Sequence, residues 1–118
     1  MQILVAENHA LYQTTLCEFL DMLPDVLVCG RASDGQEGVR LGRRLKPDVV
    51  VAELKLPKLG GFRLCQRLRE SLPQLGTVIY TEDPMGHLEE HRPEWVDHFV
   101  SKDTIFEELP AYFERLRG

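Results

Sequence analysis

The sequence predicts an α/β domain in which five parallel strands form one sheet with helices on both faces. Five short apolar runs, rich in β-branched or aromatic residues and bounded by turn formers, alternate along the chain with segments of helical apolar spacing. The runs are apolar throughout, which is typical of strands covered on both sides. Alternation of such strands with helices predicts a parallel sheet. The predicted strands are Ile3–Ala6, Val26–Cys29, Val49–Ala52, Val78–Tyr80 and Phe99–Val100.

The first three predicted helices lie between these runs. Apolar residues recur every three or four positions at Tyr12, Leu16, Leu20 and Leu23, and again at Leu64, Leu68 and Leu72. Two proline-containing turns, Leu23-Pro24-Asp25 and Lys46-Pro47-Asp48, predict the ends of the first and second helices. Gly38 and Gly42 lie inside the second helix, and each is expected to weaken it by about 1 kcal/mol relative to alanine.

The last two helices carry weaker signals. Pro84, Pro93 and many acidic residues lie between Thr81 and Phe99, so a short or broken fourth helix is expected there. Pro110 predicts a kink or a late start in the final helix, whose apolar positions are Ile105, Leu109, Tyr112, Phe113 and Leu116. Asp103-Thr104 followed by Glu107 and Glu108 predicts a capped start, with acids at the positive end of the helix dipole.

Length and composition favour one globular domain over residues 1–118. The chain is 43% hydrophobic and 28% charged, which argues against disorder and coiled coil. No apolar run approaches the roughly 18 residues of a membrane span, and the N-terminus lacks the basic flank of a signal peptide. Cys17, Cys29 and Cys65 are too scattered for a disulfide framework and are interpreted as small apolar residues. A soluble cytoplasmic domain is expected.

The charge is unevenly distributed along the chain. Residues 31–69 contain ten Lys/Arg and four Asp/Glu, for a net charge of +6, whereas the remaining residues contain four and fifteen, for a net charge of −11. Solvated helix faces would explain this pattern, and so would steering of a charged partner. No aromatic platform or helix-turn-helix accompanies the basic residues, so an acidic protein partner is favoured over nucleic acid. This basic group is Arg40, Arg43, Arg44, Lys46, Arg63, Arg67 and Arg69.

Polar residues follow four of the five predicted strands. In open parallel sheets, ligands bind outside the carboxyl ends of the strands, so these residues are expected to meet at one edge. Carboxylate and amide oxygens can hold a hard cation, and lysine and hydroxyl groups can donate to an anion. The sequence therefore predicts a small polar site formed by Glu7, Asn8, Glu53, Thr81 and Lys102.

The chain resembles the CheY-like receiver domain of bacterial response regulators, and it is most similar to those of the NarL/LuxR type. The resemblance rests on the stretches ENHALYQTTLCEFL, RASDGQEGVRLGRRLKPDVVVAELKLPKLGGFRLCQRLR and SKD, and it covers nearly the whole chain. It implies a flavodoxin-like, doubly wound sheet of strand order 2-1-3-4-5. It also implies phosphorylation of an aspartate by a histidine kinase as the family's usual chemistry.

Several positions depart from the family pattern. Glu7 and Asn8 stand where the resemblance places the acidic pair that holds Mg²⁺, and Glu53 stands at the phospho-acceptor position. Thr81 and Phe99 fall at the switch positions, although Phe99 lacks a phenolic hydroxyl and is interpreted mainly as core. The family's lysine is present as Lys102. Pro57 matches the loop after the acceptor, and Gly60 replaces the usual acid before Gly61.

The extra methylene of Glu53 is expected to prevent ordinary phosphotransfer, because a displacement near 1 Å can cost roughly a hundredfold in rate. Glu7 and Asn8 are expected to weaken Mg²⁺ binding, so no cofactor and no enzymatic activity are predicted. Glu53 could pair with Lys102 or reach Thr81. The domain would then be locked in an active-like state, or have an output independent of phosphate, or keep these residues only as a satisfied polar cluster.

The resulting prediction is an atypical receiver domain that signals through protein contacts. The partner is unidentified, a homodimer is one option, and no direct contact with nucleic acid or membrane is expected. Two alternatives stay open: a receiver with an unusual phosphoryl acceptor, and the N-terminal regulatory part of a DNA-binding response regulator. His87-Leu88-Glu89-Glu90-His91 matches an H-x-x-E-H zinc pattern. Flanking prolines leave barely two turns, so an exposed acidic loop is the preferred interpretation.

Overall fold

A computed structural model describes residues 1–82 and 92–118 of the chain. Its five strands form one parallel sheet of order β2-β1-β3-β4-β5, as predicted. The expected fourth helix falls largely on residues 83–91, which lie outside the described part. In chain order the elements are β1 (Gln2–Ala6), α1 (Ala10–Asp21), β2 (Leu27–Ala32), α2 (Gly35–Leu45), β3 (Val49–Glu53), α3 (Gly61–Ser71), β4 (Gly76–Thr81), β5 (His98–Ser101) and α5 (Ile105–Arg117).

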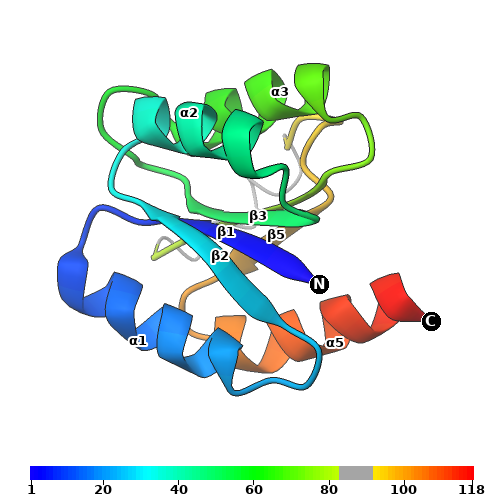
Figure 1. Ribbon diagram of the computed structural model, residues 1–118. Helices are drawn as coiled ribbons and strands as arrows, with labels where there is room; N and C mark the ends of the chain where they lie inside the picture. The colour runs from blue at the N-terminus through cyan, green and yellow to red at the C-terminus, as the bar shows by residue number, and fades with distance from the viewer. Residues whose placement is uncertain (83–91) are drawn as a thin grey trace.

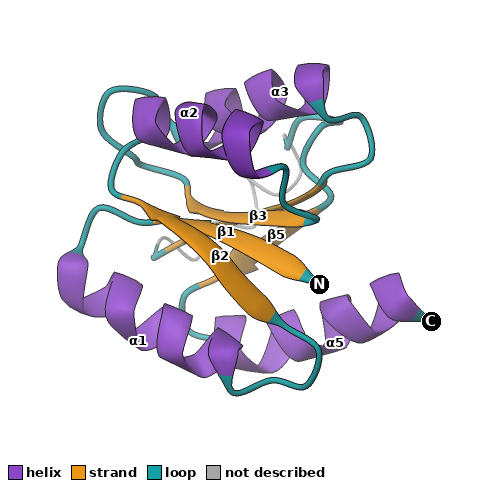
Figure 2. Ribbon diagram, viewed as in Figure 1, coloured by secondary structure: helices purple, strands orange, loops and turns teal. Residues whose placement is uncertain are grey.

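The sheet is the middle of three layers. Helices α2 and α3 cover one face, and α1 and α5 cover the other (Figures 1 and 2). The central strand β3 is buried along its whole length, which agrees with its uninterrupted apolar run. Val49 and Val51 of β3 pack toward α1 and α5, whereas Val50 and Ala52 pack toward α2 and α3. Each face of the sheet therefore has its own apolar core.

Strand β2 differs from its prediction. It spans Leu27–Ala32 instead of Val26–Cys29, and it lies at the edge of the sheet, paired with β1. Leu27 is 56% exposed, and Arg31 is exposed as well. An edge strand has one unpaired side and thinner helix cover, so its burial is incomplete and its polar end is not marked by an apolar run.

The final helix corrects one expectation and confirms part of another. It begins at Ile105, five residues before Pro110, so a late start is wrong. Ile105 and Leu109 are fully buried, and the amides of Glu107 and Glu108 donate to the carbonyl of Thr104, so packing and the first hydrogen bonds set the start. Thr104 is the N-cap residue and Glu107 and Glu108 lie in the first turn, as predicted. The Thr104 hydroxyl, however, donates to the Glu108 carboxylate and caps no backbone amide.

The glycines of α2 have a packing role that helix propensity did not reveal. A Cβ added at Gly42 would lie 2.7 Å from Cδ1 and Cδ2 of Leu68, and one at Gly38 would lie 3.0 Å from Cδ1 of Leu64. Real Cβ atoms essentially never come closer than 3.0 Å, and contacts of 3.0–3.4 Å are tighter than nine in ten, so Gly42 is required for the close approach of α2 to α3 and Gly38 eases it. Helix α2 ends at Lys46 in the left-handed conformation, with φ of 51°, just before Pro47 as predicted.

The three cysteines are free and lie in α1, β2 and α3, where the sequence predicted them. None of the described helices has the length and apolar character needed to cross a bilayer.

Candidate functional site

The five polar residues expected at the carboxyl ends of the strands line one hollow of about 500 Å³. Glu7 and Asn8 follow β1, Glu53 ends β3, Thr81 ends β4, and Lys102 follows β5. Parallel strands that end at the same edge of a sheet bring these positions together. His9, Lys55 and Glu82 complete the lining.

Lys102 is the centre of this site. Its Nζ lies 3.3 Å from Oε2 of Glu53 and 3.5 Å from Oε1 of both Glu7 and Glu82. Nζ also sits 4.1 Å from the centroid of the Tyr12 ring. The Lys102 side chain is only 14% exposed, and those of Glu7 and Glu53 are 3% and 11% exposed. A charge removed from water this far needs partners, and the surrounding carboxylates and π-face supply them.

Every oxygen of the two buried carboxylates has a partner. Oε1 of Glu7 accepts a hydrogen bond of 2.6 Å from the Tyr80 hydroxyl, and its Oε2 accepts one of 2.8 Å from the His9 amide. Oε1 of Glu53 accepts a hydrogen bond of 3.2 Å from the Lys55 amide, while its Oε2 faces Lys102. We name Glu7, Glu53, Lys102, Tyr12 and Tyr80 the Lys102 cluster.

The electrostatics of the cluster keep Lys102 charged and the tyrosines neutral. Burial alone would lower the pKa of Lys102, but the carboxylates of Glu7, Glu53 and Glu82 outweigh it, so this pKa is raised. Burial raises the pKa of Tyr80 far above its usual value, and the hydrogen bond to Glu7 adds to the effect. Burial, reinforced by Glu7 and Glu53, raises the pKa of Tyr12 to about 12.

The remaining predicted residues occupy different environments. Asn8 is exposed at the mouth of the hollow, and Thr81 is 2% exposed in its wall. Phe99 is 7% exposed and packs in the core between the sheet and α3, with its ring centroid 6.1 Å from that of Phe62. The structure therefore places Phe99 in the core layer and away from the Lys102 cluster.

Two members of the cluster, Tyr12 and Tyr80, were not predicted as site residues from the sequence. Tyr80 counted as the end of an apolar run, and Tyr12 counted as an apolar position of the first helix. The available signal was chemical, because a buried tyrosine hydroxyl usually needs a hydrogen-bond partner, and Tyr80 and Glu7 lie at the carboxyl ends of the strands on either side of β3. His9 caps α1, with its Nδ1 accepting from the Tyr12 amide at 3.3 Å.

Within residues 1–82 and 92–118, no three His, Cys, Asp or Glu side chains are grouped so that they could hold a metal ion. The H-x-x-E-H segment at residues 87–91 lies outside the described part.

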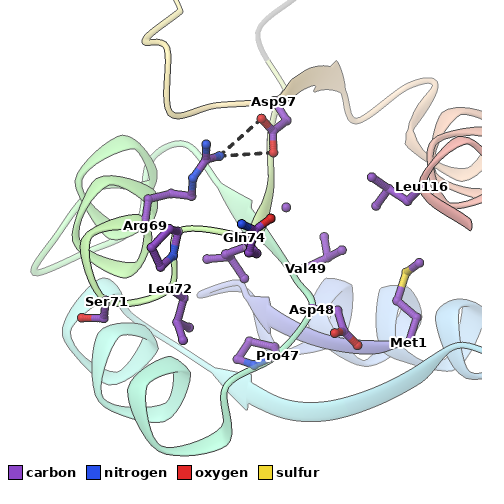
Figure 3. Close-up of a pocket in the computed structure, with 13 residues that line it drawn as sticks. Met1, Pro47, Asp48, Val49, Arg69, Ser71, Leu72, Gln74, Asp97 and Leu116 are labelled. Atoms are coloured by element: carbon purple, nitrogen blue, oxygen red, sulfur yellow. Dashed lines mark hydrogen bonds and ion pairs between the residues drawn. The ribbon is translucent and has the colours of Figure 1, made fainter.

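A larger hollow of about 650 Å³ lies at the opposite edge of the sheet (Figure 3). Its main charged pair is Arg69 with Asp97, whose carboxylate lies 3.3 Å from Nη1 of Arg69 and also accepts the Thr77 amide at 3.0 Å. Thr77 in turn donates its hydroxyl to the Trp95 carbonyl at 2.6 Å. These bonds hold the segment before β5 against β4 and α3. The charged residues of this hollow therefore have a structural role.

The strand order, the helix layers and the polar hollow at the carboxyl edge together define a receiver domain of the response-regulator class. The chain matches the response regulator receiver domain family over residues 3–114, and it belongs to that family. A structure of a LuxR-family two-component response regulator from Aurantimonas sp. SI85-9A1 superposes with a TM-score of 0.88 at 24% identity, covering 98% of this chain and 83% of that one. The predicted CheY-like receiver fold is confirmed.

Two curated relatives show how much of a longer protein the match covers. Response regulator GacA of Pseudomonas aeruginosa is 34% identical over 87 residues, which are 71% of this chain and 41% of that protein. A Myxococcus xanthus protein-glutamate methylesterase/protein-glutamine glutaminase is 41% identical over 79 residues, or 67% of this chain and 23% of that protein. The chain thus spans less than half of either relative, and the likeness to the esterase concerns the receiver family alone.

Proposed function

We propose that this chain is an atypical receiver domain that acts in the cytoplasm through protein–protein contacts, without aspartyl phosphorylation and without catalysis. The observation that carries the proposal is the ion pair between Glu53 and Lys102 at 3.3 Å. The residue at the acceptor position is thereby engaged by the lysine of its own site, and its second oxygen accepts the Lys55 amide. No oxygen of Glu53 is left as an unpartnered nucleophile.

The length of the side chain adds a second argument. Phosphoryl transfer requires the nucleophile, the phosphoryl group and the metal ion to be in line. The extra methylene of Glu53 moves its carboxylate by about a C–C bond length, and misplacement near 1 Å can cost roughly a hundredfold in rate. In this chain the Glu53 carboxylate lies 3.3 Å from Lys102, and this ion pair stabilises the displaced position of the carboxylate.

The same contacts argue against a Mg²⁺ site. Mg²⁺ demands a nearly octahedral set of oxygen ligands and gives up its water reluctantly. Glu7 and Glu53 would have to release Tyr80 and Lys102 before binding it, and the remaining family position is the neutral amide of Asn8. The donor set therefore fits the ion poorly, and we propose that the domain works without it.

The direct test is phosphoryl transfer itself. The wild-type chain and a receiver domain with aspartate at the acceptor position are incubated with Mg²⁺ and acetyl phosphate, and intact mass is measured. Mg²⁺ with beryllofluoride is then titrated while NMR shifts and the fluorescence of Trp95 are followed. Trp95 is the single tryptophan and donates to the Phe62 carbonyl at 3.0 Å, so it reports on packing against α3.

We expect the aspartate-bearing control to respond and the wild-type chain to remain unmodified. The double variant Asn8→Asp/Glu53→Asp restores the family's acidic pattern and is expected to gain a response. A saturable wild-type response that disappears in Glu53→Gln would instead establish a phosphoryl-accepting receiver with an unusual acceptor. Because the curated relatives are much longer than this chain, we further propose that such a domain serves as the regulatory part of a larger response regulator.

A further inference from the structure

One face of the molecule carries exposed positive charge with few partners. Helix α2, its C-cap and helix α3 present six exposed basic residues, which we name the basic face: Arg40, Arg43, Arg44, Lys46, Arg63 and Arg67. Among the described residues, the one ion pair that reaches this set joins Arg40 to Glu37 at 4.0 Å. The basic face is therefore almost uncompensated within the part of the chain that the structure describes.

This arrangement works against the stability of the fold. Arg40 with Arg44 and Arg63 with Arg67 are like charges at i,i+4 spacing, which destabilise a helix. Helices α2 and α3 cover the same face of the sheet, so both rows belong to one layer of the molecule (Figure 1). Five of the six residues are arginine, whose planar guanidinium suits bidentate pairing with carboxylates. The repulsion among these side chains destabilises the fold and is not offset by ion pairs within the described part of the chain, which points to a binding partner.

The opposite layer carries the complementary charge. Helices α1 and α5 and the turns beside them present six exposed acids, which we name the acidic face: Glu18, Asp21, Asp25, Asp103, Glu107 and Glu114. No ion pair involves Glu18, Glu107 or Glu114 within residues 1–82 and 92–118. The arginines of α5 are engaged with their own chain, since Arg117 donates to the Pro24 carbonyl at 2.9 Å and Arg115 lies 5.9 Å from the Tyr112 ring centroid.

We propose that the partner is a second copy of this chain, and that the basic face of one copy stacks on the acidic face of the next. One type of contact then accounts for both faces, whereas an unrelated acidic protein would account for the basic face alone. The molecule measures 33 × 30 × 29 Å. Such a face can provide the roughly 800 Å² per partner of a standard interface.

The geometry fixes the kind of assembly. The two faces lie on opposite sides of the sheet (Figure 2), so the contact is heterologous and leaves one free face at each end. The expected products are open head-to-tail chains of copies instead of a closed dimer. Nucleic acid is the weaker candidate, because the net charge of −5 opposes a polyanion and Phe62, the aromatic residue of α3, packs in the core.

The first test is self-association measured by sedimentation velocity over a range of protein and salt concentrations. Electrostatic contacts between exposed faces weaken as the Debye length falls from about 30 Å at 0.01 M salt to about 8 Å at 0.15 M. We expect the sedimentation coefficient to rise with protein concentration at low salt, and the association constant to fall at least about tenfold across that salt range. A chain that stays monomeric at low salt, or associates without salt dependence, would overturn the proposal.

The decisive test is complementation between two charge-reversed variants. Arg43→Glu/Arg67→Glu lowers the charge of the six basic-face residues from +6 to +2 and leaves the acidic face intact. Glu18→Lys/Glu107→Lys lowers the charge of the six acidic-face residues from −6 to −2 and leaves the basic face intact. Each alone should lack the native contact and be monomeric, yet their mixture should form 1:1 dimers and nothing larger, because each pair joins the two remaining native faces. Arg43→Lys/Arg67→Lys keeps the charge and should still assemble, and circular dichroism checks that every variant is folded.

A mixture that stays monomeric while both variants are folded would overturn the proposal. So would a wild-type chain that stays monomeric and instead binds a poly-glutamate peptide or duplex DNA, because the basic face would then have a different occupant. None of the residues changed here belongs to the Lys102 cluster. Failure of this proposal is therefore distinguishable from failure of the proposed function, which is tested at Glu53.

Discussion

Replacing Lys102 with methionine tests the Lys102 cluster most directly. Methionine keeps most of the aliphatic volume of lysine and removes its ammonium group. Glu7 and Glu53, whose side chains are 3% and 11% exposed, would lose their shared cation at 3.5 and 3.3 Å. Breaking a buried ion pair by removing one partner typically costs about 3–5 kcal/mol, because the other charge is left buried and uncompensated.

The structure places this substitution near the lower end of that range. The hollow beside Lys102 is open to water, and the backbone amides of His9 and Lys55 continue to donate to the two carboxylates. Loss of the cation–π contact with Tyr12 adds about 0.5–1 kcal/mol. We therefore expect Lys102→Met to lower the free energy of unfolding by about 3 kcal/mol at neutral pH, or to lower Tm by roughly 10 °C.

Urea denaturation followed by circular dichroism and Trp95 fluorescence measures this change. The control is a double-mutant cycle with Glu53→Gln, which should destabilise the wild-type chain but cost much less in the Lys102→Met background. The folded-state pKa of Lys102 is raised, so its contribution is fully present below the unfolded value of about 10.4 and is lost as the pH rises through the folded value. A cost below about 1 kcal/mol with no coupling to Glu53 would refute the cluster as a stabilising unit.

Three further predictions concern the same structure. Tyr80→Phe removes a hydrogen bond to a buried carboxylate and should cost about 1.5–3 kcal/mol in chemical denaturation; an unchanged midpoint would contradict this. Gly42→Ala should destabilise by about 1–3 kcal/mol despite alanine's better helix propensity, because its Cβ would overlap Leu68, and Gly38→Ala should cost less. Burial raises the pKa of Tyr12 and of Tyr112 to about 12 and that of Tyr80 further. Between about pH 10 and 12 the unfolded chain therefore loses tyrosine protons that the native chain keeps, and each tyrosine should lower stability by about 1.4 kcal/mol per pH unit. The phenolate absorbance of all three tyrosines should then appear together with loss of circular dichroism, and phenolate formation before unfolding would disprove the assigned burial.

The sheet was predictable from the sequence because burial on both faces is encoded residue by residue. The run Val49–Ala52 has no polar interruption, and it is the centre of the sheet. Convergence of Glu53 and Lys102 at one edge follows from parallel topology alone. The edge strand β2 was harder to delimit, because Gly30 and Arg31 belong to it without any apolar signal.

The contacts inside the site required three-dimensional information. Tyr12 and Tyr80 satisfy an apolar pattern with their rings, so periodicity does not distinguish a packed ring from one whose hydroxyl binds Glu7. Gly42 shows the same limit, since helix propensity is a local quantity and the approach of Leu68 is a property of two helices packed together. In both cases the decisive neighbour is distant in the sequence.

The Lys102 cluster is paired internally, whereas the helices carry exposed charge, and this contrast indicates where a partner would bind. With Glu53, Glu7 and Lys102 satisfying one another, every carboxylate oxygen of Glu7 and Glu53 already has a partner. Exposed charge with few ion-pair partners lies instead on the outer surfaces of α2–α3 and of α1–α5. These charges can attract a partner without prior phosphorylation of the domain. Under the two proposals, a signal enters or leaves this domain through those helix surfaces, and its strength depends on protein concentration and ionic strength rather than on phosphate.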